Sequence, residues 1–181
     1  SGHIPAVGFE IYTQMMEQAV HELRGEPVET DLEPEIAIGV PAYIPDSYLD
    51  DVNQRLVWYK RLAAMRRPEE RVLLAEEMTD RYGPPPPLVE TLLEVMDLRR
   101  RMKALGIEEA RLKGPKLVLL LHTSTPIPPD GLVGFVAASR GRLSVTPDSQ
   151  LLLPTAARGG ALLDELRGLL GSLEGLLPRG G

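Results

Sequence analysis

Apolar positions recur at spacings of three and four residues through most of the chain, which is the spacing of amphipathic helices. The predicted helices cover residues 7–23, about 50–67, 68–82, about 88–105, about 130–139 and 161–177. Asp50 or Asp51 can accept the first backbone N–H groups of the second helix. Glycines that can adopt a left-handed capping conformation follow three of the helices, at Gly25, Gly83 and Gly106. The first half of the chain is therefore predicted to be helical.

The same spacing selects the side chains that should face the core. In the helix over 50–67 they are Leu56, Tyr59 and Leu62, with Trp58 and Met65 on a flank. In the helix over 68–82 they are Val72, Ala75, Met78 and Tyr82, and in the helix over 88–105 they are Leu88, Leu92, Val95 and Met102.

Strands are predicted between and after these helices. Residues 36–40 alternate in side-chain size, and residues 116–123 are apolar through their middle, as in a strand covered on both faces. Residues 143–145 and 151–153 flank a turn sequence at 146–149 and predict a hairpin. These elements indicate an α+β fold, in which the helical N-terminal half packs with a small, mainly antiparallel sheet and flanking helices.

Composition is that of an ordinary folded protein. The 181 residues suffice for one domain with its own core, and 43% hydrophobic and 25% charged residues are typical values. No apolar run approaches the roughly 20 residues needed to cross a bilayer, and the start of the chain lacks the features of a signal peptide. Since cysteine is absent as well, we expect a cytoplasmic protein without disulfides. A chain that starts at Ser1 rather than Met suggests a fragment of a longer protein.

Charge is distributed unevenly along the chain. Residues 1–98 contain 19 acidic and 8 basic residues, whereas residues 99–181 contain 7 and 12. An acidic first half disfavours a DNA-binding face, because phosphate contacts need clustered Lys and Arg, and it suits a basic protein partner. The basic run Arg99-Arg100-Arg101 could touch nucleic acid, but it has no interleaved aromatic residues. A solvated helix end explains the run better.

No catalytic or cofactor-binding constellation is found in the sequence. A glycine-rich phosphate-binding loop is missing, and His3, His21 and His122 are not spaced as zinc ligands. His122 ends an apolar strand, where a hydrogen-bonded structural role is favoured over catalysis. We therefore expect this chain to have no enzymatic activity and no cofactor or metal of its own.

One acidic surface in the sequence is a candidate for binding a partner. Glu76, Glu77 and Asp80 project from the helix over 68–82, with Arg81 beside them. The like charges of Glu76 and Asp80, four residues apart, cost a few tenths of a kcal/mol, which the Glu77–Arg81 pair offsets. Spacing alone leaves two interpretations: a solvated polar face, or a docking patch for an arginine-bearing partner.

Three stretches of sequence carry a resemblance to a known family. They are Ser1-Gly2-His3-Ile4-x-x-Val7-Gly8-Phe9-Glu10-x-Tyr12; Ala42-Tyr43-Ile44-Pro45-Asp46 with Gln54-Arg55-Leu56-x-x-Tyr59-Lys60-Arg61-Leu62-Ala63; and Asp80-Arg81-Tyr82-Gly83-x-x-Pro86 with Leu92-Leu93-x-x-x-x-Leu98-Arg99 and Leu105-Gly106-Ile107. In this order and spacing they resemble the C-terminal domain of the bacterial transcription-repair coupling factor. The resemblance covers about residues 1–110, and beyond them only the pattern of strand, helix and hairpin agrees.

The resemblance implies a role within a larger protein. In this family the full-length protein is an ATP-dependent superfamily 2 DNA translocase, which displaces RNA polymerase stalled at a lesion and recruits the excision-repair protein UvrA. Its ATP and Mg²⁺ bind in a motor upstream of this chain. Residues 1–25 would then form a helix leading from the motor, and residues 26–181 the C-terminal regulatory domain. That domain packs on the N-terminal UvrA-binding module, masks its UvrA-binding surface and restrains the motor.

The resemblance also implies which residues make this contact. Glu77 and Asp80 fall on family positions that pair with arginines of the UvrA-binding module, and Glu76 and Arg81 lie beside them. The expected partners are that module directly and UvrA and RNA polymerase indirectly, with no nucleic acid or membrane bound by this chain. The alternative is an independent acidic module that contacts another partner, such as RNA polymerase.

Overall fold

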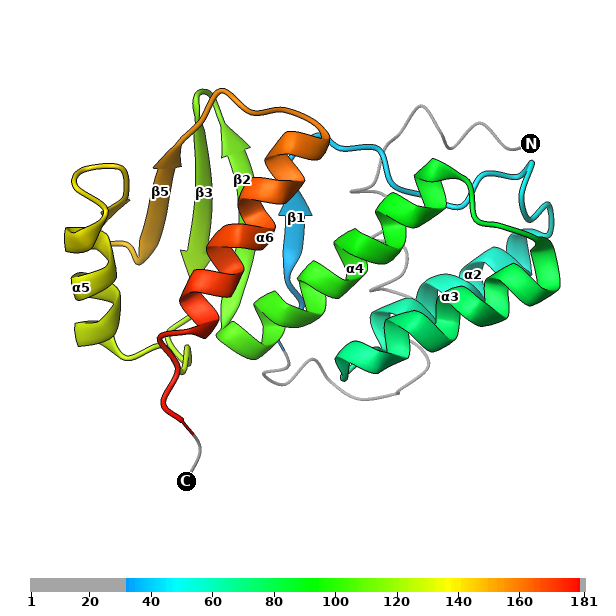
Figure 1. Ribbon diagram of the computed structural model, residues 1–181, viewed down its shortest axis with the longest axis horizontal. Helices are drawn as coiled ribbons and strands as arrows, with labels where there is room; N and C mark the ends of the chain where they lie inside the picture. Colours follow the sequence, from blue (N-terminus) through cyan, green and yellow to red (C-terminus); the bar gives the residue numbers. More distant parts are fainter. Residues whose placement is uncertain (1–31, 180–181) are drawn as a thin grey trace. The chain divides into compact units, whose positions relative to one another are not determined.

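The computed structural model describes residues 32–179, which form two compact units (Figure 1). The described part of the helical unit is Val40–Arg100, and the sheet unit combines Leu32–Gly39 with the chain from Arg101 onward. The predicted helix over residues 7–23 and the domain boundary expected at residue 25 lie outside the described residues.

The helical unit is built from α2 (Val52–Ala63), α3 (Pro68–Tyr82) and α4 (Pro87–Leu105), whose last turn belongs to the sheet unit. The carboxylate of Asp51 accepts hydrogen bonds from the backbone N–H groups of Asn53 (2.8 Å) and Gln54 (3.2 Å), which confirms the predicted cap. Proline suits the first turn of a helix, and α3 begins at Pro68 as predicted. Gly83 ends it with φ of 89°.

The inward face predicted for α2 is partly wrong. Trp58 is 1% exposed and belongs to the core rather than to a flank, whereas Leu56 is only half-buried. Arg55 is buried because its guanidinium donates to the backbone carbonyls of Leu49 (2.7 Å) and Asp50 (3.0 Å). A buried guanidinium needs such partners, and helical spacing cannot reveal backbone acceptors in a preceding loop.

The apolar stripe predicted for α3 is also displaced. Leu74 and Met78 are buried, but Val72 is 58% exposed and the neighbouring Leu73 is 62% exposed. Apolar residues occupy more than one face of this helix, so its period alone did not determine which face packs. Val72 is thereby left on a solvent-facing side of α3.

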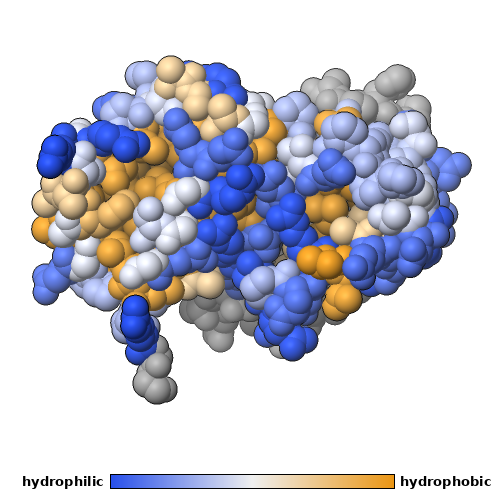
Figure 2. Space-filling model, in the orientation of Figure 1, coloured by the Kyte–Doolittle hydropathy of each residue, from blue (hydrophilic) through white to orange (hydrophobic). Residues whose placement is uncertain are grey.

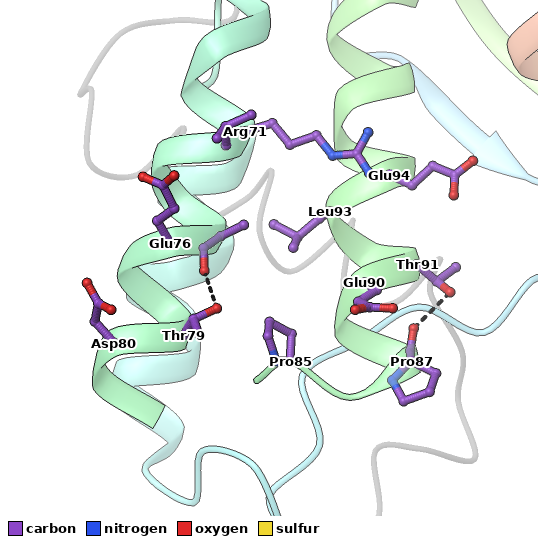
Figure 3. Close-up of a pocket in the computed structure, with 12 residues that line it drawn as sticks. Arg71, Glu76, Thr79, Asp80, Pro85, Pro87, Glu90, Thr91, Leu93 and Glu94 are labelled. Carbon is purple, nitrogen blue, oxygen red and sulfur yellow. Dashed lines mark hydrogen bonds between the residues drawn. The ribbon is translucent and has the colours of Figure 1, made fainter. Parts of the chain in front are cut away.

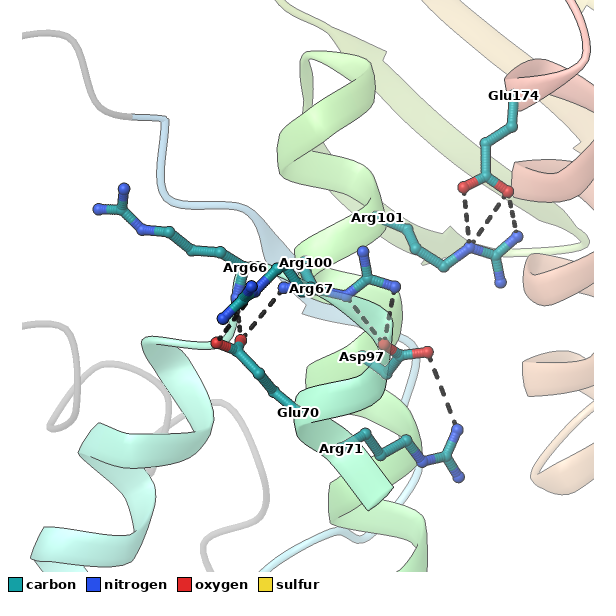
Figure 4. A network of polar contacts seen from close by, with 8 residues as sticks. All are labelled: Arg66, Arg67, Glu70, Arg71, Asp97, Arg100, Arg101 and Glu174. Atoms are coloured by element: carbon teal, nitrogen blue, oxygen red, sulfur yellow. Dashed lines mark hydrogen bonds and ion pairs between the residues drawn. The ribbon is translucent and has the colours of Figure 1, made fainter. Parts of the chain in front are cut away.

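Helix α4 buries far more of its surface than the single stripe predicted. Its buried apolar side chains are Val89, Leu92, Leu93, Val95, Met96, Leu98, Met102 and Leu105, and the predicted Leu88 is half-buried. The solvated helix end predicted for the arginine run is wrong, since Arg99 is 4% exposed and Arg100 pairs with Asp97 at 2.9 Å (Figure 4). Within the sheet unit, Arg101 forms an ion pair with Glu174 at 2.5 Å.

The sheet unit contains five strands in the order β1-β2-β3-β5-β4. Their bounds are Glu35–Ala37 (β1), Ile107–Lys113 (β2), Lys116–Leu121 (β3), Ser144–Val145 (β4) and Gln150–Pro154 (β5). Among residues 32–179, only β1 and β2 pair in parallel, which confirms a mainly antiparallel sheet in an α+β fold. The hairpin of β4 and β5 is confirmed, the strand predicted over 36–40 ends earlier, and β2 was not predicted.

Two helices complete the sheet unit, α5 (Pro129–Ala138) and α6 (Gly160–Glu174), near the positions predicted. Helix α6 lies across the sheet in Figure 1 and buries six leucines: Leu162, Leu163, Leu166, Leu169, Leu170 and Leu173. Leu117, Leu119 and Leu121 alternate along β3 and are also buried, so leucine dominates this core.

Candidate functional site

A groove of about 830 Å³ lies between α3 and the first half of α4 in the helical unit (Figure 3). Its lining residues are Arg71, Val72, Ala75, Glu76, Thr79, Asp80, Pro85, Pro87, Glu90, Thr91, Leu93 and Glu94. Four of them are carboxylates, and three others, Val72, Ala75 and Leu93, have aliphatic side chains. The groove therefore combines acidic and apolar surface.

Two of the four predicted site residues, Glu76 and Asp80, line this groove from α3. The sequence prediction missed Glu90 and Glu94, which line it from α4. The signal that could have found them is their spacing of four residues, the same as that of Glu76 and Asp80, which places each pair on one side of its helix.

The polar groups of the groove are mainly hydrogen-bond acceptors. The hydroxyls of Thr79 and Thr91 donate to their own helix carbonyls, Ala75 (2.8 Å) and Pro87 (2.9 Å), as Figure 3 shows. The guanidinium of Arg71 lies 3.8 Å from the carboxylate of Asp97 (Figure 4). The positive charge of Arg71 is therefore partly neutralised by Asp97. A ligand rich in N–H donors and positive charge is the natural complement of such a surface.

The other two predicted residues, Glu77 and Arg81, are not part of the groove. Glu77 accepts two hydrogen bonds from the guanidinium of Arg61 on α2, at 2.5 and 2.8 Å, and one from Arg81 at 3.4 Å. The expected pairing of Glu77 with Arg81 is thus present. Arg61 also stacks over the ring of Trp58, with 4.4 Å between the guanidinium carbon and the ring centroid.

The structure therefore divides the predicted acidic patch into two parts. Glu77 has two arginine partners, so its charge is compensated within the helical unit. Glu76 and Asp80 are exposed, and among residues 32–179 neither forms an ion pair. The uncompensated negative charge of α3 lies on its groove side.

The arginines also change the acidity of Glu77. The pKa of Glu77 is lowered from 4.5 to about 2. The main cause is the hydrogen bond from Arg61, and the positive charges of Arg61 and Arg81 add to it. The backbone N–H groups of Arg66 and Arg67 likewise lower the pKa of Glu70 (Figure 4). Both carboxylates are therefore ionised in the folded protein at any neutral pH.

This shift predicts an acid-dependent loss of stability. A carboxylate whose pKa is lowered on folding stabilises the protein fully above its unfolded pKa, about 4.5, and progressively less as pH falls toward 2. We expect the urea midpoint to be constant near neutrality and to fall below pH 4.5. The difference between the wild type and Glu77→Gln should be largest above pH 5 and should shrink with acidification. A difference that does not vary between pH 7 and 3 would contradict the assignment.

Outside the groove, the described residues give few signs of chemistry. Within 32–179, no group of three or more His, Asp or Glu side chains is placed to hold a metal ion. The Nδ1 atom of His122 accepts a hydrogen bond from the backbone N–H of Ser124 at 3.0 Å, a local contact in line with the structural role predicted for it. Among the same residues, no helix is long and apolar enough to span a membrane.

The fold and this surface define an α+β domain with an acidic groove between α3 and α4. The family model of the TRCF domain matches residues 38–132. The transcription-repair-coupling factor of Myxococcus xanthus is 36% identical over 96% of the chain, and that of Bacillus subtilis is 38% identical over 54%. The chain therefore belongs to the transcription-repair-coupling factor family. It spans 15% of the length of the M. xanthus relative.

A solved structure supports the same fold. The crystal structure of a C-terminal domain of transcription-repair coupling factor matches with a TM-score of 0.68 at 21% sequence identity. The match covers 83% of this chain and 97% of that one. The arrangement of helices and strands described above is thus the fold of that domain.

Proposed function

We propose that this chain is the C-terminal regulatory domain of a transcription-repair coupling factor and docks on the UvrA-binding module of the same protein. Docking would mask the UvrA-binding surface and restrain the ATP- and Mg²⁺-dependent translocase elsewhere in the parent protein. Family membership and the solved C-terminal domain support this role. The regulatory domain itself would contribute binding rather than catalysis to transcription-coupled DNA repair.

The observation that carries the proposal is the uncompensated acidic edge of the groove. Glu76 and Asp80 on α3 and Glu90 on α4 are all exposed, and Val72 beside them is 58% exposed. Arginines of the UvrA-binding module could pair with these carboxylates while apolar side chains fill the groove between them. Glu77 would take part less directly, because its carboxylate already binds Arg61.

The expected energetics suit a docked state that can be released. We call this docking of the domain on the UvrA-binding module the latch. A single exposed ion pair contributes only about 0–1 kcal/mol, so stable docking needs several pairs around a packed apolar centre. Covalent linkage within one protein raises the effective concentration of the two partners, so a weak intrinsic affinity can still keep the two domains mostly docked. RNA polymerase or UvrA could then open it with a few kcal/mol of differential binding.

Charge reversal at the groove tests the proposal. In calorimetry of the 181-residue chain against the isolated UvrA-binding module, Glu76→Lys and Asp80→Lys should each weaken binding about tenfold, or about 1.4 kcal/mol. Asp148→Lys, an equal charge change at the exposed turn between β4 and β5, should leave binding unchanged. Wild-type affinity should also fall as salt is raised.

A second assay covers a latch that works only when tethered. In the intact protein, Asp80→Lys should increase capture of UvrA and raise the basal ATPase rate, because the masked surface is released. If reversal at Glu76 and Asp80 changes neither isolated binding nor UvrA capture, the proposal is wrong. An independent acidic module that binds another partner, such as RNA polymerase, would then be the better account.

A further inference from the structure

Helix α5 of the sheet unit is strongly apolar, yet none of its side chains is buried. Its ten residues, Pro-Asp-Gly-Leu-Val-Gly-Phe-Val-Ala-Ala, include one charged side chain, Asp130, in the first turn. Val133 is 68% exposed, the largest exposed fraction among the large apolar side chains described as exposed. Apolar atoms gather at the side of the molecule where α5 lies (Figures 1 and 2). A helix of this composition normally packs one face against another element.

The inner side of α5 is accounted for by its own unit. Phe135 lines a groove of about 470 Å³ together with Leu153 of β5 and Leu169 of α6. Gly131 lies close to Pro128 and Leu176. Residues 131 and 135 are four apart and share one side of the helix, so α5 leans on its unit along this side.

The outer side carries a pattern with its own symmetry. Asp130, Val133 and Ala137 follow each other at spacings of three and four, which places them along one exposed face. Arg140 follows the end of the helix and is also exposed. Among residues 32–179, neither Asp130 nor Arg140 forms an ion pair. An acid thus begins this face, apolar residues form its middle and a base ends it.

We propose that this face of α5 binds the same face of a second copy of the chain, with the two helices antiparallel. The pattern is self-complementary in that arrangement. A two-fold axis that crosses the outer face at the height of residue 135 along the helix places Asp130 opposite Arg140 of the other copy. The same axis places Val133 opposite the small Ala137, so a large side chain meets a small one on both sides. Such reciprocal contacts are what an isologous dimer requires. The antiparallel order also opposes the two helix dipoles favourably.

The interface is small, so the dimer is weak. One ten-residue helix on each side falls in the size class of transient contacts, below about 1,200 Å² in total. A dissociation constant of roughly 0.1–1 mM is expected for the free 181-residue chain. Association would then matter where two copies are held close together.

Sedimentation equilibrium of the 181-residue chain up to roughly 1 mM tests this proposal. The wild type should show a monomer–dimer equilibrium that Val133→Asp abolishes, and because Val133 is exposed the variant should keep its circular dichroism spectrum. Val57→Asp, a matched change at an exposed valine of the helical unit outside the groove, should leave the equilibrium intact. Asp130→Arg or Arg140→Asp alone should raise the dissociation constant about tenfold, and the double swap should restore it.

Cross-linking tests the antiparallel register directly. The chain has no cysteine, so single-cysteine variants report one position each. A short bismaleimide should join Val133→Cys to Ala137→Cys in a mixture faster than it joins either variant to itself. A wild type that stays monomeric at the highest concentration overturns the proposal, as does a dimer that survives Val133→Asp. Equal cross-linking in all combinations overturns the antiparallel register.

Discussion

Replacing Trp58 with alanine is expected to lower the free energy of unfolding by about 3–5 kcal/mol. The indole is 1% exposed and contacts Tyr82 edge-to-face, with 6.2 Å between the ring centroids. Its Nε1–H donates to the Tyr82 hydroxyl at 3.2 Å. Truncation would leave a cavity between α2 and α3 and remove the surface on which Arg61 stacks.

Urea denaturation followed by far-UV circular dichroism measures this loss. Trp58→Phe serves as the control, because it keeps most of the buried volume and loses the indole N–H. It should cost only about 1–2 kcal/mol. A loss below 1 kcal/mol for Trp58→Ala would mean that the indole is not part of the core. The guanidinium of Arg61 stacks on Trp58 and binds the carboxylate of Glu77. Trp58→Ala should therefore also weaken the dependence of the urea midpoint on pH below 4.5.

Gly106→Ala should destabilise the sheet unit by about 3 kcal/mol, combining about 1 kcal/mol of backbone strain with overpacking. Gly106 has φ of 68°, which disfavours any residue with a Cβ. A Cβ placed there would lie 2.5 Å from the Cα of Thr125, a backbone atom that cannot move aside cheaply. The Gly106 carbonyl also accepts the backbone N–H of His122 at 2.8 Å, which holds the two segments together.

Gly114, a second glycine with positive φ in the same unit, serves as a control that separates the cost of backbone strain from the cost of a steric clash. Gly114 has φ of 56°, but a Cβ there would meet no atom within 4 Å. Gly114→Ala should therefore cost about 1 kcal/mol, the strain alone. Equal losses for the two variants in thermal unfolding would show that the close approach of Thr125 is not energetically important.

Local signals made the helices predictable. Asp51, Pro68 and Gly83 act on the backbone of their immediate neighbours, so the sequence alone places these helix ends. Which face of a helix packs depends instead on residues distant in sequence. Trp58 became a core residue because Tyr82 lies against it.

Strand β2 escaped prediction because its pattern is irregular. Ile107 and Ala110 are its fully buried positions, and they are three residues apart rather than two. A register shift between Ile107 and Glu109 accounts for the extra residue, since a bulge breaks the alternation of a strand. The remaining side chains are mostly charged, so no apolar run marked the segment.

The candidate site was predictable only in part, because some of its side chains are oriented by partners that lie far away in the sequence. The spacing of Glu76 and Asp80 placed both on one side of their helix, and the structure puts both on the groove. That Glu77 turns toward α2 depends on Arg61, which is sixteen residues away in sequence. The pairing of Arg101 with Glu174 spans 73 residues and has no local signature.

The position of β1 has a consequence for the order in which the chain can fold. Glu35 pairs with Glu109 across the parallel part of the sheet, so the described part of the helical unit, Val40–Arg100, lies between two parts of the sheet unit in sequence. During synthesis, β1 leaves the ribosome before β2, so it has no strand partner until residues 40–113 have also emerged. Closing so long a loop is slow, and until then the β2 edge stays open to other chains. The helical unit can thus complete its core during translation, whereas the sheet unit must wait for nearly the whole chain.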